Sequence, residues 1–264
     1  MSSLILVKII VTMVAVVGLS LVAERISTRL AGVLAGFPHG IAIVLYFIGV
    51  EQGAEFAAQA AQFATAGLGA NVVLAYTYAR LSRGRGPGQA AWAALGAIAA
   101  FLGVAFVIVL IQPGPALSVI LTMLAIAGVR LLLTFMPVDA SAVMTSVRPG
   151  ELVLRALLAA AIVVLITGLA ALLGPGRAGI LAGFPVVTFP LLLILHARHG
   201  AVFVRRVVRH YPFGILSLVV YTLTASWGFS TLGVGWGTLA GLGAALAYLS
   251  LASVSSSAIA KDRS

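Results

Sequence analysis

The octapeptide Ala-Gly-Val-Leu-Ala-Gly-Phe-Pro occupies residues 31–38, and Ala-Gly-Ile-Leu-Ala-Gly-Phe-Pro occupies residues 178–185. Seven of the eight positions are identical, and the offset is 178 minus 31, or 147 residues. The same offset aligns identical residues over much of a half-chain: Leu45 with Leu192, Gly53 with Gly200, and Thr77 with Thr224. A long repeat of this kind in an apolar chain is typical of a pseudo-symmetric helix bundle with a shared central site.

The composition places the chain in a membrane. Of the 264 residues, 62% are hydrophobic and 8% are charged, which leaves too little polar surface for a soluble domain. Apolar runs of about 20 residues, separated by Gly, Pro and Arg, predict membrane-spanning helices. The expected fold class is an all-α polytopic membrane protein with about nine transmembrane helices. The candidate spans cover residues 3–23, 29–50, 55–80, 89–111, 115–136, 151–173, 177–197, 209–229 and 232–254.

The first apolar run has two interpretations. Residues 4–23 carry Lys8 near their start, as a signal peptide does. The repeat favours a retained span, because this segment aligns with residues 151–170 inside the chain, where Lys8 falls on Arg155.

The predicted loops differ in positive charge according to whether they follow an odd-numbered or an even-numbered span. Loops after odd-numbered spans hold nearly all the loop cations, whereas loops after even-numbered spans hold Glu51 and Glu55, Arg177 alone, or no charge. The positive-inside rule then places the N-terminus outside and the C-terminus in the cytoplasm. The net charge of +10 is therefore a topology signal, and no nucleic-acid partner is expected. The basic stretch from Arg198 to Arg209 predicts contact with anionic lipids at the cytoplasmic face.

The spans group into two copies and a connector. Repeat one covers residues 1–112 with spans 1–4, the connector with span 5 covers residues 113–147, and repeat two covers residues 148–264 with spans 6–9. An offset of five spans turns the second copy upside down, so the sequence predicts a 4+1+4 inverted-topology repeat. This prediction depends on residues 115–136 crossing the membrane, and they are long and apolar enough to do so.

The Gly-Phe-Pro part of the octapeptide lies near the start of spans 2 and 7, as Gly36-Phe37-Pro38 and as Gly183-Phe184-Pro185. Proline removes a backbone donor and disfavours helix at the residue before it, and glycine tolerates the distortion. The functional interpretation is a pair of broken helices whose N-termini meet near the symmetry axis and bind an anion. The alternative is an ordinary kink that lets the helices pack closely.

Three polar residues of the spans are further candidates for substrate contacts. His39 follows the first motif. Its functional interpretation is a proton relay or a ligand contact, and the alternative is a histidine that is hydrogen-bonded in a helix interface. Thr188 follows the second motif. Asn71, in the middle of span 3, fits either a substrate contact or an interhelical hydrogen bond.

Lys8 and Arg155 are the symmetry-equivalent cations of spans 1 and 6. A charge at the bilayer centre costs roughly 3 kcal/mol on insertion scales, so it normally faces a cavity or a partner. Both residues lie roughly 7 Å from the start of their span, so snorkelling to the interface is the alternative. A functional role for this pair predicts an anionic substrate.

Catalysis has no candidate in this sequence. It contains no nucleophile–base pair, no glycine loop for phosphate and no His/Asp/Glu cluster at metal spacing, and it has no cysteine. We therefore expect no enzyme activity, no metal site and no cofactor.

A family resemblance rests on the second copy, through Leu152-Val153-Leu154-Arg155-Ala156, the octapeptide at residues 178–185, Leu191-Leu192 and His196. This pattern resembles the GlpM-like family of small four-span bacterial inner-membrane proteins. The resemblance covers about residues 151–254 and, through the shared motif, residues 3–111, and it implies a fused duplicate in the bacterial inner (plasma) membrane. The family name links it to glycerol-phosphate genes and exopolysaccharide production. Repeat one departs from the pattern at Gly49, which aligns with His196.

The sequence thus predicts a secondary transporter of a small anionic or phosphate-bearing metabolite, either soluble or lipid-linked. Rocking of the two repeats would give alternating access, in the style of fused drug/metabolite transporters. The expected partners are the lipid bilayer and the small-molecule anion. The sequence is compatible with either a monomer or a homodimer. The rival is a non-transporting scaffold or accessory protein of an envelope-polysaccharide assembly. A polar cavity between the two motif helices favours the transporter, and a tightly packed apolar core favours the scaffold.

Overall fold

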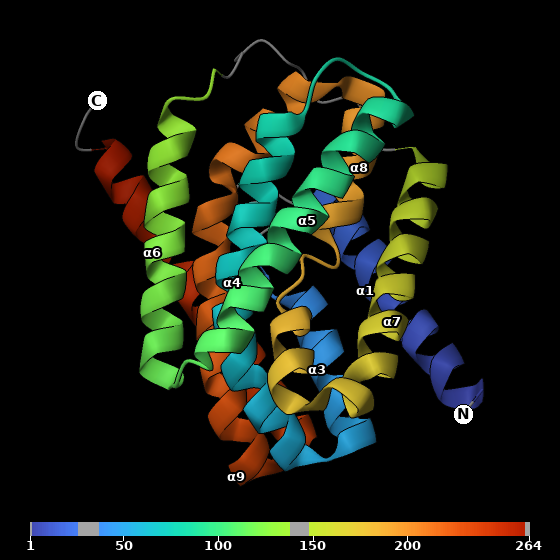
Figure 1. The fold of residues 1–264 in the computed structure, drawn as a ribbon, viewed down its shortest axis with the longest axis vertical. Coiled ribbons are helices and arrows are strands. Elements are labelled where there is room, and N and C mark those ends of the chain that lie inside the picture. The colour runs from blue at the N-terminus through green and yellow to red at the C-terminus, as the bar shows by residue number, and fades with distance from the viewer. Residues whose placement is uncertain (1, 26–36, 138–147, 262–264) are drawn as a thin grey trace.

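The computed structural model describes residues 2–25, 37–137 and 148–261 of the chain, and all regular secondary structure in these ranges is helical. Figure 1 shows the helices as one bundle, most of them running along its long axis. The helices are α1 (Ser2–Arg25), α3 (His39–Gln52), α4 (Ala54–Leu81), α5 (Pro87–Ile111), α6 (Pro115–Thr134), α7 (Pro149–Ala182), α8 (Thr188–His199) and α9 (Ala201–Lys261).

Five stretches are long and apolar enough to cross a membrane: Ser3–Leu21, Pro87–Ile111, Pro115–Thr134, Pro149–Ala182 and Ala201–Ser253. They belong to α1, α5, α6, α7 and α9. Large apolar side chains on them face outward, for example Leu110 at 68% exposure and Leu172 at 81%. Such surfaces suit lipid rather than water. This agrees with the predicted class of a helical, multi-pass membrane protein.

The helix α4 forms the centre of the bundle. It packs against α3, α5, α6, α7 and α9, and its buried residues are mostly alanine and glycine. Small residues let helix backbones approach closely, which is how helices associate without a hydrophobic driving force. A Cβ on Gly67 of α4, or on Gly179 or Gly183 at the end of α7, would lie under 3.0 Å from backbone atoms of the facing segment. The end of α7 is therefore held directly against α4.

Two of the helical elements contain a reversal. Gly174 in α7 has φ 74° and ψ 167°, and Gly233 in α9 has φ 78° and ψ 169°. Beyond Gly233 the chain folds back on itself, since Gly237 lies against Gly228 of the preceding segment. Each of α7 and α9 is therefore two helical segments joined at a glycine, because a left-handed backbone of this kind is readily adopted only there.

The 147-residue spacing recurs in the turns. Gly53 (φ 94°) and Gly200 (φ 80°) are separated by this interval, and so are Gly86 (φ 116°) and Gly233 (φ 78°). Left-handed glycines at equivalent positions mean that the two copies share turn conformations as well as sequence.

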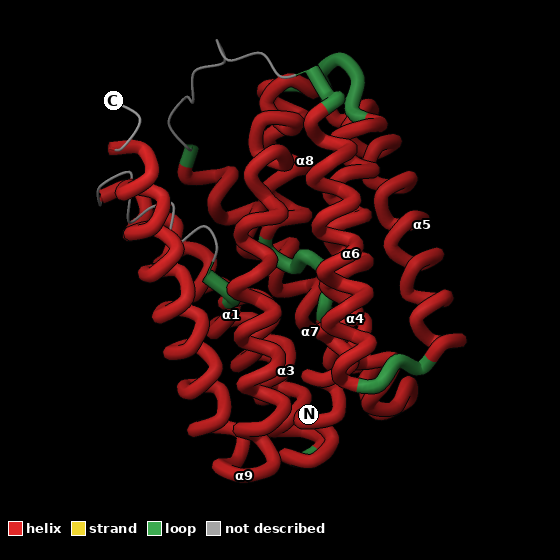
Figure 2. Tube along the Cα trace, turned by 90° about the vertical axis from the view of Figure 1, so that its left-hand side faces the viewer, coloured by secondary structure: helices red, strands yellow, loops and turns green. Residues whose placement is uncertain are grey.

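The helices α3 and α8 are short, with 14 and 12 residues, and they occupy different halves of the bundle. Figures 1 and 2 show α3 in the lower half and α8 in the upper half. The α3 end of the bundle is defined here as the end where Gln52 lies, and the α8 end as the end where His199 lies.

Candidate functional site

The Phe-Pro parts of the two motifs, Phe37-Pro38 and Phe184-Pro185, form the same backbone turn. In the first motif, the His39 amide donates to the Phe37 carbonyl at 2.9 Å, and in the second the Val186 amide donates to the Phe184 carbonyl at 2.8 Å. The carbonyl of each proline, Pro38 and Pro185, then accepts the first bond of the following helix. Gly36 lies outside the described residues. The sequence predicted a break at each motif, and the described part shows α7 ending at Ala182 before α8 begins.

The N-termini of α3 and α8 meet in the interior. A Cβ on Gly40 would lie 3.2 Å from Cγ2 of Val187, and Gly40 plus 147 is position 187, so equivalent positions touch each other. Neither helix has a side-chain hydrogen bond at its N-cap. Because a helix N-terminus carries a partial positive charge, the two helices point their positive ends toward the same place.

Asn71 stabilises the break at the second motif. Its side-chain amide donates to the Gly183 carbonyl at 2.7 Å, and its oxygen accepts a bond from the Tyr211 hydroxyl at 2.7 Å. Asn71 is 1% exposed, and the Tyr211 hydroxyl also lies within hydrogen-bonding reach of Thr188. In this state Asn71 makes the interhelical contact that was the alternative to substrate binding. It pairs a carbonyl that the end of α7 would otherwise leave without a partner.

The phenylalanines of the two motifs have different surroundings. The Phe184 ring packs edge-on against Phe101 and Phe189, with centroids 5.2 Å apart in both pairs. Phe37 stacks on the His39 ring at 6.5 Å. Phe184 thus belongs to the apolar core, whereas Phe37 and His39 line a cavity.

That cavity has a volume of about 450 Å³ and lies between α1, α3 and the last segment of α9. It is almost entirely apolar, and its lining includes Val14, Phe47 and Leu242 beside His39 and Thr238. The structure therefore places this cavity beside the first motif.

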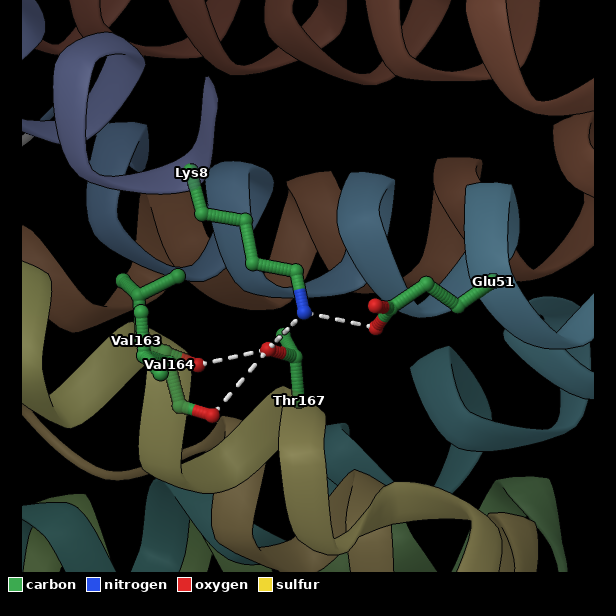
Figure 3. A network of polar contacts seen from close by, with 5 residues as sticks. All are labelled: Lys8, Glu51, Val163, Val164 and Thr167. Atoms are coloured by element: carbon green, nitrogen blue, oxygen red, sulfur yellow. Dashed lines mark hydrogen bonds and ion pairs between the residues drawn. The ribbon is translucent and has the colours of Figure 1, made fainter. Parts of the chain in front are cut away.

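Lys8 is buried and neutralised. Its ammonium lies 2.7 Å from Oε2 of Glu51 and 2.7 Å from Oγ1 of Thr167, as Figure 3 shows. The residue is 2% exposed, and its ammonium sits 6.0 Å from the centroid of Phe47. Lys8 therefore has a carboxylate partner from α3 and a hydroxyl partner from α7, and it does not snorkel to the surface.

Arg155 is the contrasting case. Its Nη1 is 3.5 Å from Oγ of Ser20, and its buried Nε has no hydrogen-bond partner among the residues that the structure describes. The two ion pairs of the described residues, Lys8–Glu51 and Arg198–Glu151, do not include it. Since a guanidinium has five N–H donors and a fixed charge, Arg155 is the better candidate of the two cations for an anion contact. It also lies close enough to His39 to act on that ring electrostatically.

The partners of the two cations are themselves equivalent. Lys8 of α1 bonds Thr167 of α7, and Arg155 of α7 bonds Ser20 of α1, where Ser20 plus 147 is position 167. Each hydroxyl donates in turn to a carbonyl one helical turn earlier, at Val16 and Val163. This reciprocal pattern has the form of a two-fold contact between antiparallel helices.

Sequence reasoning missed Ser20, Thr167 and the role of Glu51 as partners of the cations. The signal was present in the sequence. Ser20 and Thr167 are the one equivalent pair in spans 1 and 6 at which both residues carry a hydroxyl. Glu51 was read only as a loop charge, yet it closes the ion pair with Lys8.

Arg155, His39 and the paired helix N-termini are thus brought near one another, whereas Lys8 and Asn71 are already occupied. Comparison of the chain with protein-family models, curated proteins and solved structures found no match.

Proposed function

We propose that this chain is a secondary transporter that binds an anionic or phosphate-bearing metabolite at Arg155. The observation that carries the proposal is the partly buried guanidinium with an unpartnered Nε. A charge within a membrane-spanning helix is expensive unless it meets a partner or a cavity. Among the described residues, Arg155 has a long bond to the Ser20 hydroxyl and no carboxylate partner, so we propose a substrate anion as its partner.

The architecture proposed for this transporter is nine spans in a 4+1+4 inverted repeat. Three observations support it: the reversals at Gly174 and Gly233, the left-handed glycines at the 147-residue spacing, and the reciprocal contacts of Lys8 and Arg155. The N-termini of α3 and α8 meet at equivalent positions, which is where inverted-repeat transporters place their site. We keep the expected orientation, with the N-terminus outside and the C-terminus in the cytoplasm of a bacterial inner membrane.

The test is ligand-dependent thermal unfolding of the purified protein in detergent. The probes are inorganic phosphate, glycerol 3-phosphate and a short-chain phosphatidic acid. A ligand at 100 times its Kd stabilises the folded state by about 2.7 kcal/mol, so at least one probe should raise the unfolding temperature. Arg155→Ala should abolish that rise and, in proteoliposomes, the flux of the same probe, while membrane levels of the protein stay unchanged.

Arg130→Ala is the matched control. Arg130 carries the same charge on α6 but is exposed, and its guanidinium lies 4.7 Å from the centroid of Phe213. This variant should respond to the probes as the unmodified protein does. If Arg155→Ala and the unmodified protein show the same rise in unfolding temperature with a probe, Arg155 is not the anion site. If no probe raises the unfolding temperature of the unmodified protein, these three anions are excluded as ligands.

The second candidate function is the non-transporting scaffold of an envelope assembly. It is favoured by the cavity beside His39, whose lining is almost entirely apolar, and by the close packing of α7 on α4. Under this hypothesis Arg155→Ala alters stability alone, and no probe moves across the membrane.

A further inference from the structure

The far ends of α3 and α8 carry charges of opposite sign at equivalent positions. Glu51 lies near the end of α3, Arg198 lies near the end of α8, and 51 plus 147 is 198. Each is followed two residues later by a left-handed glycine, Gly53 or Gly200. Each short helix thus runs from a Gly-Phe-Pro turn in the interior to a charged residue and a glycine turn at its end.

Each charged end is held by an ion pair to a longer helix. Glu51 pairs with Lys8 of α1, and their side chains are 22% and 3% exposed. Arg198 pairs with Glu151 at the start of α7, and their side chains are 27% and 19% exposed. Loss of one partner of such a pair leaves the other charge without compensation.

The two ion pairs lie at opposite ends of the bundle. The Lys8–Glu51 pair is at the α3 end and the Glu151–Arg198 pair is at the α8 end, because α3 and α8 occupy opposite halves in both Figure 1 and Figure 2. Between them the two helices begin at the same interior place, where Gly40 contacts Val187. Because the side chain of Val187 fills the space at Gly40, a displacement of the N-terminus of one short helix must shift the N-terminus of the other.

From this arrangement we infer that α3 and α8 are the two gates of the transporter, each hinged at its Phe-Pro turn (Phe37-Pro38 or Phe184-Pro185) and latched by its ion pair. This inference rests on the proposed function, because alternating access needs a barrier on each side of the anion site. In the state observed, both latches are closed. Opening of the Lys8–Glu51 latch exposes the interior to the α3 end, and opening of the Glu151–Arg198 latch exposes it to the α8 end.

The experiment uses reporter cysteines, which are clean because the chain has no cysteine of its own. Both reporters lie on α7 and replace fully buried residues: Val163→Cys, one turn inside Thr167, and Ala156→Cys, just inside Glu151. Each is labelled with a membrane-impermeant maleimide in right-side-out and in inside-out vesicles. Glu51→Gln breaks the first latch and Glu151→Gln breaks the second, with nearly the same side-chain volume.

Glu51→Gln should raise labelling of Val163→Cys about tenfold from the side of the α3 end, the effect of about 1.4 kcal/mol on a two-state equilibrium. Labelling of Ala156→Cys from the other side should fall. Glu151→Gln should produce the reverse pattern, and the exchanged pair Lys8→Glu with Glu51→Lys should restore the original rates. Glu55→Gln is the matched control, because Glu55 is exposed and bonds only Gln59 in the described structure.

Unchanged labelling in both latch variants would overturn the inference, and so would a parallel rise at both reporters, which indicates general loosening. The readout needs no substrate, so it separates the two claims. If the latch variants show reciprocal labelling and the Arg155→Ala variant still responds to anions, the gates are supported and the anion site is rejected. Loss of anion binding in Arg155→Ala with unchanged labelling would do the opposite.

Discussion

The ammonium of Lys8 and the guanidinium of Arg155 occupy equivalent positions, yet only Lys8 has a carboxylate partner in the described residues. The reason lies at the ends of the short helices. The residue equivalent to Glu51 is Arg198, which repels a guanidinium instead of neutralising it. Arg198 pairs with Glu151, one turn before Arg155. One local exchange of charge sign therefore leaves a single cation of the pair without a carboxylate partner among the described residues, and this is the cation at which we propose anion binding.

Asn71 offers a test at the same scale. Asn71→Leu keeps the shape of the side chain but leaves the Gly183 carbonyl and the Tyr211 hydroxyl without their partner. An unsatisfied buried group costs about 1–3 kcal/mol, so thermal unfolding in detergent, followed by tryptophan fluorescence, should shift downward. Tyr211→Phe should destabilise the unmodified protein but add little to Asn71→Leu. Strict additivity of the two variants would contradict a shared network.

At the scale of the elements, proline and glycine made much of the helix pattern predictable. The sequence placed the loops after spans 6 and 8 at residues 174–176 and 230–231, and the chain reverses at Gly174 and Gly233. Pro185 predicted the interruption before α8. The position of α4 at the centre was not predicted, although its buried residues are mostly alanine and glycine, which favour close helix contacts. Partners of buried charges were missed because they come from helices distant in sequence.

The close contact of α4 with α7 gives a second prediction. Gly67→Ala puts a methyl group under 3.0 Å from the backbone of Ile180, and overpacking of this kind costs about 1–3 kcal/mol. The variant should unfold at a lower temperature. Gly103→Ala is the control on α5, because a Cβ there meets nothing within 4 Å and should stabilise the helix by about 0.4–1 kcal/mol. Equal effects of both variants would show that α4 and α7 do not pack tightly.

For the whole molecule, the orientation of the two halves is the prediction with the widest consequences. Gly88 and Gly235 are equivalent positions, both exposed, and a Cβ at either meets nothing within 4 Å. Single cysteines there should fold without strain. In intact cells an impermeant maleimide should label Gly235→Cys but not Gly88→Cys, because the inverted topology puts the two turns on opposite sides. Labelling of both, or of neither, would make the copies parallel and favour the scaffold.

Both ion pairs join residues of the same half, Lys8 with Glu51 and Glu151 with Arg198. Several polar contacts described between the halves join a charged or amide side chain to an uncharged partner, as at Lys8–Thr167, Arg155–Ser20 and Asn71–Gly183. Severing the gene between the codons for Met136 and Arg148 would therefore yield two products that each keep their own ion pair. Co-expressed with separate affinity tags, the two halves should copurify as a heterodimer. Either half expressed without the other should not form the assembled protein.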